Sequence, residues 1–181
     1  MIRNIISILL ILITPIVQGQ KLIAKNAHIR FYSHTPIEDI EAHNRQAVSI
    51  LDPATGELQF KLLIKAFEFE KKLMQEHFNE NYMESDKFPK ASFTGKIINM
   101  SEIDLDADGK YPVIAEGELT IRGITQRINI SGTLTVMNGK VSANSVFMVS
   151  PKDYAIDIPN LVRDNIAREI EVTVSVNYSS N

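Results

Sequence analysis

The stretch of sequence that decides the fold is residues 125–137, TQRINISGTLTVM. Its even-numbered positions are mostly isoleucine, leucine and valine, and its odd-numbered positions are mostly threonine, serine, asparagine and arginine. Side chains of a β-strand point alternately to opposite faces, so this period of two predicts a strand with one buried and one solvated face. Asn138-Gly139 follows directly, and this pair favours a two-residue type I′ hairpin turn. We therefore expect the next strand, from Lys140, to pair with it in antiparallel orientation.

The same kind of segment recurs along most of the chain. Further predicted strands are residues 29–33, 48–51, 58–64, 91–97, 113–121, 140–150 and 170–176. Turn sequences lie between several of them, at residues 52–56 and at Arg122-Gly123. A meander of about eight strands closes economically into a barrel, because closure removes the unpaired sheet edges. The predicted fold class is all-β, a closed antiparallel β-barrel of about eight strands, with a two-sheet sandwich as the alternative.

Three segments interrupt the alternation. Residues 36–44 are acidic and contain a histidine, and residues 152–168 are irregular. Residues 70–82 instead place apolar and aromatic side chains at spacings of three and four, which is typical of one face of an amphipathic helix. We expect this short helix to lie across one end of the barrel.

The N-terminus resembles a secretory signal. A basic start precedes an apolar run over residues 5–17, which is shorter than the roughly 20 residues that a membrane-spanning helix needs. Small or aliphatic residues are spaced for cleavage at Val17-Gln18-Gly19, so residues 1–19 are predicted to be a signal peptide rather than a buried strand or helix. The mature chain, residues 20–181, is then one exported domain, periplasmic or secreted and soluble, with no integral membrane segment.

Composition narrows the possible partners. Cysteine is absent, which excludes disulfides, a thiolate nucleophile and a lipid-anchored cysteine. The formal net charge is −3, with acidic and basic residues interspersed, and this gives no reason to expect nucleic acid or an anionic membrane surface as a partner. The pattern neither predicts nor excludes an oligomer.

Several blocks, in order along the chain, resemble the YceI-like family. They are residues 31–44, 65–69, 73–85, 88–95, 117–125 and 153–156. The central blocks are the most specific, because a helix, the Tyr82-Met83 turn and the strand entry FPKA at 88–91 occur together. The resemblance covers nearly the whole mature chain and implies a lipocalin-like barrel that binds polyisoprenoid-type lipids, often in the periplasm. Ala155 is a departure, since the family commonly has glycine there.

A long apolar ligand needs a cavity with few polar wall groups, because an unpartnered polar atom facing hydrocarbon is costly. Alternation alone does not distinguish such a cavity from inward side chains that interdigitate, so a packed barrel without ligand, acting as a stress-related or interaction protein, stays an alternative. The family resemblance favours the cavity. The predicted ligand-binding residues are Ile29, Phe31, Phe60, Leu62, Phe93, Ile97, Leu119 and Ile128 on strands, with Phe67, Met74, Phe78 and Tyr82 in an apolar lid that Phe69 and Phe88 extend.

A second class of function is a metal-binding protein or metal-dependent hydrolase. Imidazole and carboxylate groups are zinc ligands, and a metal-bound water would be activated. Their spacing fits no H-E-x-x-H motif, so we expect the histidines to be polar mouth or capping residues. The candidate ligands are His34, His43 and His77, with Glu38, Asp39 or Glu41.

Other chemistries find less support in the sequence. Residues 104–109, DLDADG, begin like a calcium loop, but the final acid is out of place and Pro112 intrudes, so an acidic, solvated hairpin loop is the better interpretation. The chain has no G-x-S-x-G elbow, phosphate-binding glycine loop or dinucleotide fingerprint. The sequence therefore predicts a carrier of an apolar lipid, not an enzyme, with no cofactor.

Overall fold

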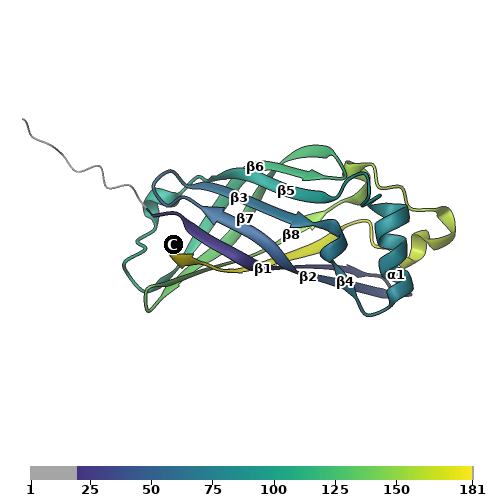
Figure 1. The fold of residues 1–181 in the computed structure, drawn as a ribbon, viewed down its shortest axis with the longest axis horizontal. Coiled ribbons are helices and arrows are strands. Elements are labelled where there is room, and N and C mark those ends of the chain that lie inside the picture. The colour runs from purple at the N-terminus through teal and green to yellow at the C-terminus, as the bar shows by residue number, and fades with distance from the viewer. Residues whose placement is uncertain (1–19, 181) are drawn as a thin grey trace, which may run out of the picture.

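The computed structural model describes residues 20–180, so the predicted signal peptide at residues 1–19 lies outside the described residues. Eight long strands wind antiparallel around a barrel (Figure 1). They are β1 (Leu22–His34), β2 (Asp39–Leu51), β3 (Glu57–Leu63), β5 (Lys90–Ile97), β6 (Gly109–Ile121), β7 (Ile124–Met137), β8 (Lys140–Val149) and β9 (Ile170–Asn177). Each pairs with the next, and β1 pairs with both β2 and β9. The predicted closed barrel is confirmed, and the sandwich alternative is wrong.

Two very short strands extend this barrel: β4 (Glu68–Phe69) pairs with β2, and β10 (Ser179–Ser180) pairs with β1. Both predicted two-residue hairpin turns have positive φ at their two central residues. Asn138 and Gly139 have φ angles of 51° and 71°, and Arg122 and Gly123 have φ angles of 50° and 75°. Positive φ at both central residues matches the right-handed twist of the flanking strands, which keeps β6, β7 and β8 in register.

One part of the strand prediction is wrong. Residues 36–44 were expected to interrupt the sheet, but β2 begins at Asp39 and runs through to Leu51. Two consecutive exposed residues at positions 45 and 46 form a bulge, which changes the inward parity from even to odd numbers. Asn44 also faces inward and is fully buried, with its amide donating to the Leu63 carbonyl (2.9 Å). A buried polar residue beside a bulge hides the alternation.

A short helical segment lies at one end of the barrel, as predicted. It consists of α1 (Lys72–His77) and a π-helical turn, η2 (Phe78–Tyr82). Single 3₁₀ turns occur at η1 (Ile64–Ala66), η3 (Met100–Glu102), η4 (Pro151–Tyr154) and η5 (Asn160–Asn165). Of the helices in residues 20–180, none is both long and apolar enough to cross a membrane.

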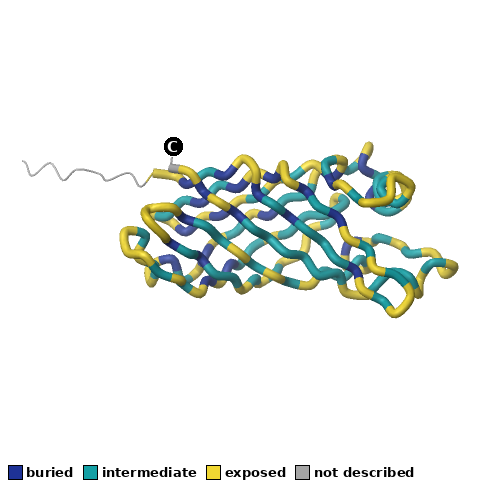
Figure 2. The backbone as a smooth tube through the Cα atoms, turned by 90° about the horizontal axis from the view of Figure 1, so that it is seen from below, coloured by how far each residue is buried: buried dark blue, intermediate teal, exposed yellow. Residues whose placement is uncertain are grey.

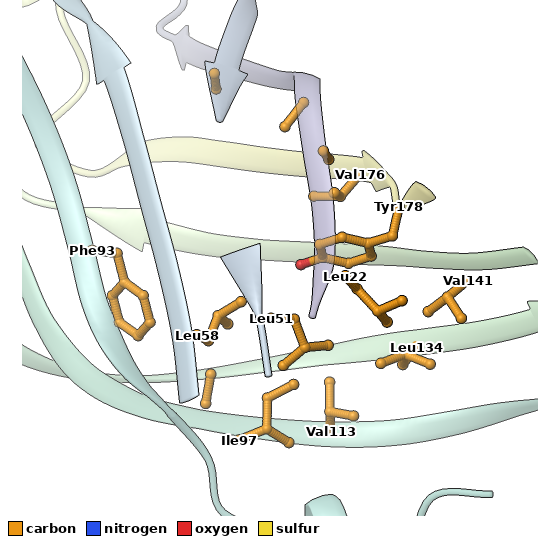
Figure 3. Packing of buried hydrophobic residues seen from close by; sticks show 14 of the residues in the cluster. Leu22, Leu51, Leu58, Phe93, Ile97, Val113, Leu134, Val141, Val176 and Tyr178 are labelled. Carbon is orange, nitrogen blue, oxygen red and sulfur yellow. The ribbon is translucent and has the colours of Figure 1, made fainter. Parts of the chain in front are cut away.

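The two ends of the barrel differ. The lid end, at the right in Figure 1, carries the helical segment, the β1–β2 turn at residues 35–38 and the β8–β9 connection at residues 150–169. The plug end carries the β2–β3 and β7–β8 turns. Its interior is filled by the buried side chains of Figure 3, which come from all the long strands and the residue after β9. The labelled members at this end are Leu22, Leu51, Leu58, Ile97, Val113, Leu134, Val141, Val176 and Tyr178.

A buried polar pair in this plug is hydrogen-bonded. The Tyr178 hydroxyl and the Ser49 Oγ are 2.8 Å apart and share a hydrogen bond. Burial disfavours the phenolate and raises the pKa of Tyr178 to about 12, so the hydroxyl stays neutral. The plug end is therefore a conventional packed core, and it forms the floor of the barrel.

Candidate functional site

A cavity of about 410 Å³ occupies the barrel interior. Its wall extends from Ile158 and Val162 at the lid end to Leu134 and Tyr178 at the plug. The wall is almost wholly apolar, and its polar members lie mainly near the lid end. Pockets for small molecules typically have volumes of about 300–1,000 Å³, so this space is large enough for a ligand.

The exposure of inward-facing side chains shows where the barrel is hollow. On β9, Val176 is only 2% exposed, whereas Val174 and Val172 on the same face are partly exposed. On β7, Leu134 is fully buried, whereas Ile130 is partly exposed. Side chains in a close-packed interior have almost no accessible surface, so the exposed part of these residues faces internal space. The interior is packed at the plug and open above it.

The structure brings eleven of the twelve predicted ligand-binding residues to the cavity wall. They are Ile29, Phe31, Phe60, Leu62, Phe67, Met74, Phe78, Tyr82, Phe93, Ile97 and Leu119. The twelfth, Ile128, packs against the core cluster from β7, and it is Ile130, one inward position further along, that reaches the wall. Contact with a ligand remains a prediction for all of them.

Phe93 is held against the wall by two glycines. Gly95 on β5 and Gly117 on β6 face each other in register. A Cβ added at either position would lie 2.7 Å from the Phe93 ring, so the ring occupies the space that two side chains would otherwise fill. Phe93 is 5% exposed as a result. This niche keeps a large aromatic ring flat on the wall and leaves the centre of the barrel free.

Three phenylalanines of the predicted lid pack around Phe31 on the barrel wall. Phe31 on β1 contacts three rings from the β3–β5 connection, with centroid distances of 5.3 Å to Phe67, 5.6 Å to Phe69 and 5.4 Å to Phe78. The geometry of these pairs is tilted, edge-on or stacked, as favourable aromatic contacts usually are. Phe88, the other residue expected to extend the lid, instead lies outside the wall and packs on Gly123.

A polar junction ties three segments of the lid end together. Glu38, in the β1–β2 turn, accepts one hydrogen bond from Lys71 Nζ and one from Asn165 Nδ2, both at 3.1 Å. These hydrogen bonds favour the carboxylate and lower the pKa of Glu38. Nearby, the buried Ser33 Oγ accepts from the Ala167 amide at 2.9 Å. The helical segment and the β8–β9 connection are thereby both fixed to the first hairpin.

A second polar junction lies across the mouth. Arg122, in the β6–β7 turn, bonds to the Glu84 carboxylate and donates to the Ala155 carbonyl. Ala155 has φ 50° and ψ 36°, a left-handed conformation in which glycine is least strained. The backbone therefore has the conformation that glycine, the residue expected at this position, would favour, although the residue is alanine.

The three histidines considered as metal ligands are not brought together, although His43 Nε2 lies 3.0 Å from Glu41 Oε1. His34 pairs with Asp39 (2.6 Å) and His43 with His28 (2.9 Å) on the outer face of β1 and β2, whereas His77 lies at the cavity mouth. Burial, together with the charge of a neighbouring arginine, lowers the pKa of His28. Within residues 20–180 the structure has no group of three or more histidine, aspartate or glutamate side chains arranged to hold a metal ion.

Sequence reasoning missed part of the mouth. Glu38 was considered only as a metal ligand, and the irregular segment 152–168 was assigned no role. Four apolar residues of that segment line the cavity: Ile156, Ile158, Val162 and Ile166. Their spacing follows no single period, because Ile156 and Ile158 are two residues apart whereas Ile158, Val162 and Ile166 are four apart. The clearest signal was that apolar side chains recur in an otherwise polar connection.

Solved structures with the same architecture support this description of the fold. A polyisoprenoid binding domain from Saccharophagus degradans, implicated in plant cell wall breakdown, has a TM-score of 0.76 and 13% identity, covering 91% of this chain and 99% of its own. BcnA of Burkholderia cenocepacia has a TM-score of 0.69 and 14% identity, covering 85% and 96%. The YceI protein of Campylobacter jejuni has a TM-score of 0.62 and 16% identity, covering 82% and 88%.

Sequence comparison gives the family. No curated protein sequence matches the chain at a significant level. The model of the YceI-like domain, however, matches residues 21–178, which span the whole barrel from the start of β1 to the tyrosine after β9. The chain therefore belongs to the YceI-like domain family.

Proposed function

We propose that the protein is a carrier that holds one long apolar chain, a polyisoprenoid or fatty acyl chain, in the barrel interior. The observation that supports this most directly is the hollow, apolar cavity between the lid and the plug. Family membership adds support, as does the structural similarity to a domain that is described as polyisoprenoid-binding.

The distribution of polar groups favours a ligand that enters with its apolar part first. A charged group in the middle of the barrel would lose its hydration with no partner on the wall, which is costly. Two charged residues, Glu38 and Lys61, are among the wall residues. Glu38 is at the mouth and is already paired with Lys71 and Asn165, and Lys61 is solvent-exposed. We therefore place the chain along Phe31, Phe60 and the other wall residues, and any polar end of the ligand near the mouth.

We also infer that the protein binds its ligand without transforming it. A hydrolase would need a base, a nucleophile or a metal-bound water close to the bound chain. Of the three histidines considered as ligands, His34 and His43 lie on the outer face, and His77 is separated from both. The apolar wall around the middle of the cavity offers hydrocarbon contacts instead of acid–base groups.

We propose further that residues 1–19 direct export and that the carrier acts in the periplasm or outside the cell. The mass of protein recovered from the exported fraction tests this directly. A mature chain that begins at Gln20 is the expected result, and recovery of protein that retains Met1 would contradict it.

Native mass spectrometry of protein purified from its own host, followed by lipid extraction, tests the carrier function. The expected result is one apolar chain per barrel. The delipidated protein should then take up isoprenoid alcohols or fatty acids in a titration. The fluorescence of a polyene fatty acid reports binding, since the protein has no tryptophan of its own. A barrel that arrives empty and binds neither class of chain would refute the proposed function.

A further inference from the structure

We propose that the lid end of the barrel docks on a neutral lipid surface, so that a chain passes between the bilayer and the cavity without crossing water. This inference rests on the proposed carrier function, since it names the surface from which the cavity is filled.

The three connecting segments at the lid end each carry a strongly exposed apolar side chain. Leu161 in η5 is 94% exposed, Ile37 in the β1–β2 turn is 64% exposed, and Leu73 in α1 is 62% exposed. They come from the three separate segments that surround the lid end, at the right in Figure 2. Removing large, exposed apolar side chains from water lowers the free energy. We call Ile37, Leu73 and Leu161 the rim.

The polar junction holds the rim segments together. Glu38 follows Ile37 directly and accepts hydrogen bonds from Lys71, two residues before Leu73, and from Asn165 of the same 3₁₀ turn as Leu161. The three apolar side chains are therefore carried by segments that are fixed to one another. Such a rim can meet one surface as a unit.

Each rim residue is also the sequence neighbour of a residue on the cavity wall. Ile37 precedes Glu38, Leu73 precedes Met74 and Leu161 precedes Val162. Glu38, Met74 and Val162 all line the cavity. The exposed apolar rim is thus continuous with the mouth, and a surface that contacts the rim faces the opening. A long apolar chain leaving through this mouth would enter the bilayer at the point of contact.

The charges of the rim segments favour a neutral surface over an anionic one. Lys71 is already paired with Glu38. In the three segments, residues 35–39, 70–82 and 156–168, the acidic residues outnumber the basic ones. The acidic residues are Glu38, Asp39, Glu70, Glu76, Glu80, Asp157 and Asp164, and the basic ones are Lys71, Lys72, Arg163 and Arg168. An anionic leaflet would therefore repel this end of the barrel.

Co-flotation of the purified protein with phosphatidylcholine vesicles tests docking. Leu161→Ser and Leu73→Ser should each lower the partition coefficient onto the vesicles, by about tenfold if the side chain is fully withdrawn from water in the wild type. Met137→Ser is the matched control, because Met137 is 62% exposed, as Leu73 is, but lies beside the β7–β8 turn at the plug end. It should leave flotation unchanged. Replacing part of the phosphatidylcholine with phosphatidylglycerol should not increase binding.

Transfer of a fluorescent polyene fatty acid between vesicles separates this proposal from the carrier function. Docking predicts that the transfer rate rises with the concentration of acceptor vesicles and falls in Leu161→Ser, while binding of the fatty acid in vesicle-free solution stays unchanged. Protein that binds the chain in solution but neither floats nor responds to vesicle concentration would overturn docking and leave the carrier standing. Rim-dependent flotation of a protein that binds no chain would overturn the carrier function and leave docking standing. If Met137→Ser lost as much vesicle binding as the rim variants, the assignment of the docking surface to the lid end would be overturned.

Discussion

Replacing Val174 with phenylalanine tests whether the middle of the barrel is hollow in solution. Val174 faces inward from the centre of β9, lines the cavity and is partly exposed to it. The substitution adds most of an aromatic ring, which can extend into the open space. Each additional buried methylene-sized group contributes about 0.8 kcal/mol, so the ligand-free barrel should gain about 1–3 kcal/mol of stability. The same ring occupies space that the bound chain would need, so binding should fall.

Val176→Phe is the matched control on the same face of the same strand. Val176 is 2% exposed and packs in the plug. Extra bulk in a filled core forces neighbouring side chains and backbone to shift, which costs about 1–3 kcal/mol. The two substitutions differ by one inward step along β9, yet their effects on the free energy of unfolding should have opposite signs.

Urea unfolding of the delipidated proteins gives the free energies, and titration with an isoprenoid alcohol gives the affinities. A hollow interior predicts a more stable Val174→Phe protein that binds the chain poorly. If both variants lost similar stability, and if Val174→Phe bound the chain as the wild type does, the hollow interior and its role in binding would be refuted.

Three other substitutions probe separate features. Gly117→Ala should destabilise the barrel by about 1–3 kcal/mol, because the new Cβ would lie 2.7 Å from the Phe93 ring and 2.6 Å from the Gly95 backbone; thermal unfolding measures this, and an unchanged Tm would contradict the niche. The folded pKa of Glu38 lies below its ordinary value of 4.5, so its hydrogen bonds stabilise the lid end above that pH and are lost as the pH falls through the lower folded pKa. Hydrogen-exchange protection at the lid end, corrected for the pH dependence of the intrinsic exchange rate, should fall in that acid range in the wild type and should stay constant there in Glu38→Gln. Replacing His34, His43 and His77 together by glutamine should leave lipid retention largely intact; stoichiometric zinc that disappears along with binding in this variant would instead favour a metal-binding function.

Much of the fold followed from the sequence, because the face of the sheet to which a strand residue points depends on its local position in the strand. Residues 125–137 alternate cleanly, and Asn138-Gly139 has the backbone preference of the turn that it forms. The first half of β2 was missed for an equally local reason. A bulge at residues 45 and 46 changes the parity of the strand, and Asn44 faces inward, where an apolar residue was expected. Alternation therefore has to be followed across such shifts one segment at a time.

The candidate site was only partly predictable, because a cavity depends on volume and on distant contacts. Alternation gives the inward residues, but whether they meet at the centre depends on their sizes around the whole barrel. Phe93 shows this, since two glycines on neighbouring strands hold its ring against the wall. Val162 and Ile166 reach the mouth through the bond between Glu38 and Asn165, which are 127 positions apart in the sequence. No period within their own segment could indicate that.

The seam of the barrel has a consequence for how the chain folds. β1 is the first long strand and β9 the last, and they pair from His28↔Ser175 to Tyr32↔Glu171. Until residues 170–177 are available, the other strands can form a sheet, but β1 and β8 remain its two free edges and its apolar face is uncovered. Pairing over such a long sequence separation is slow, because loop-closure entropy has to be overcome first. A chain that ends before β9 would therefore expose two edges able to pair with other chains, and aggregation would compete with closure from the moment of synthesis.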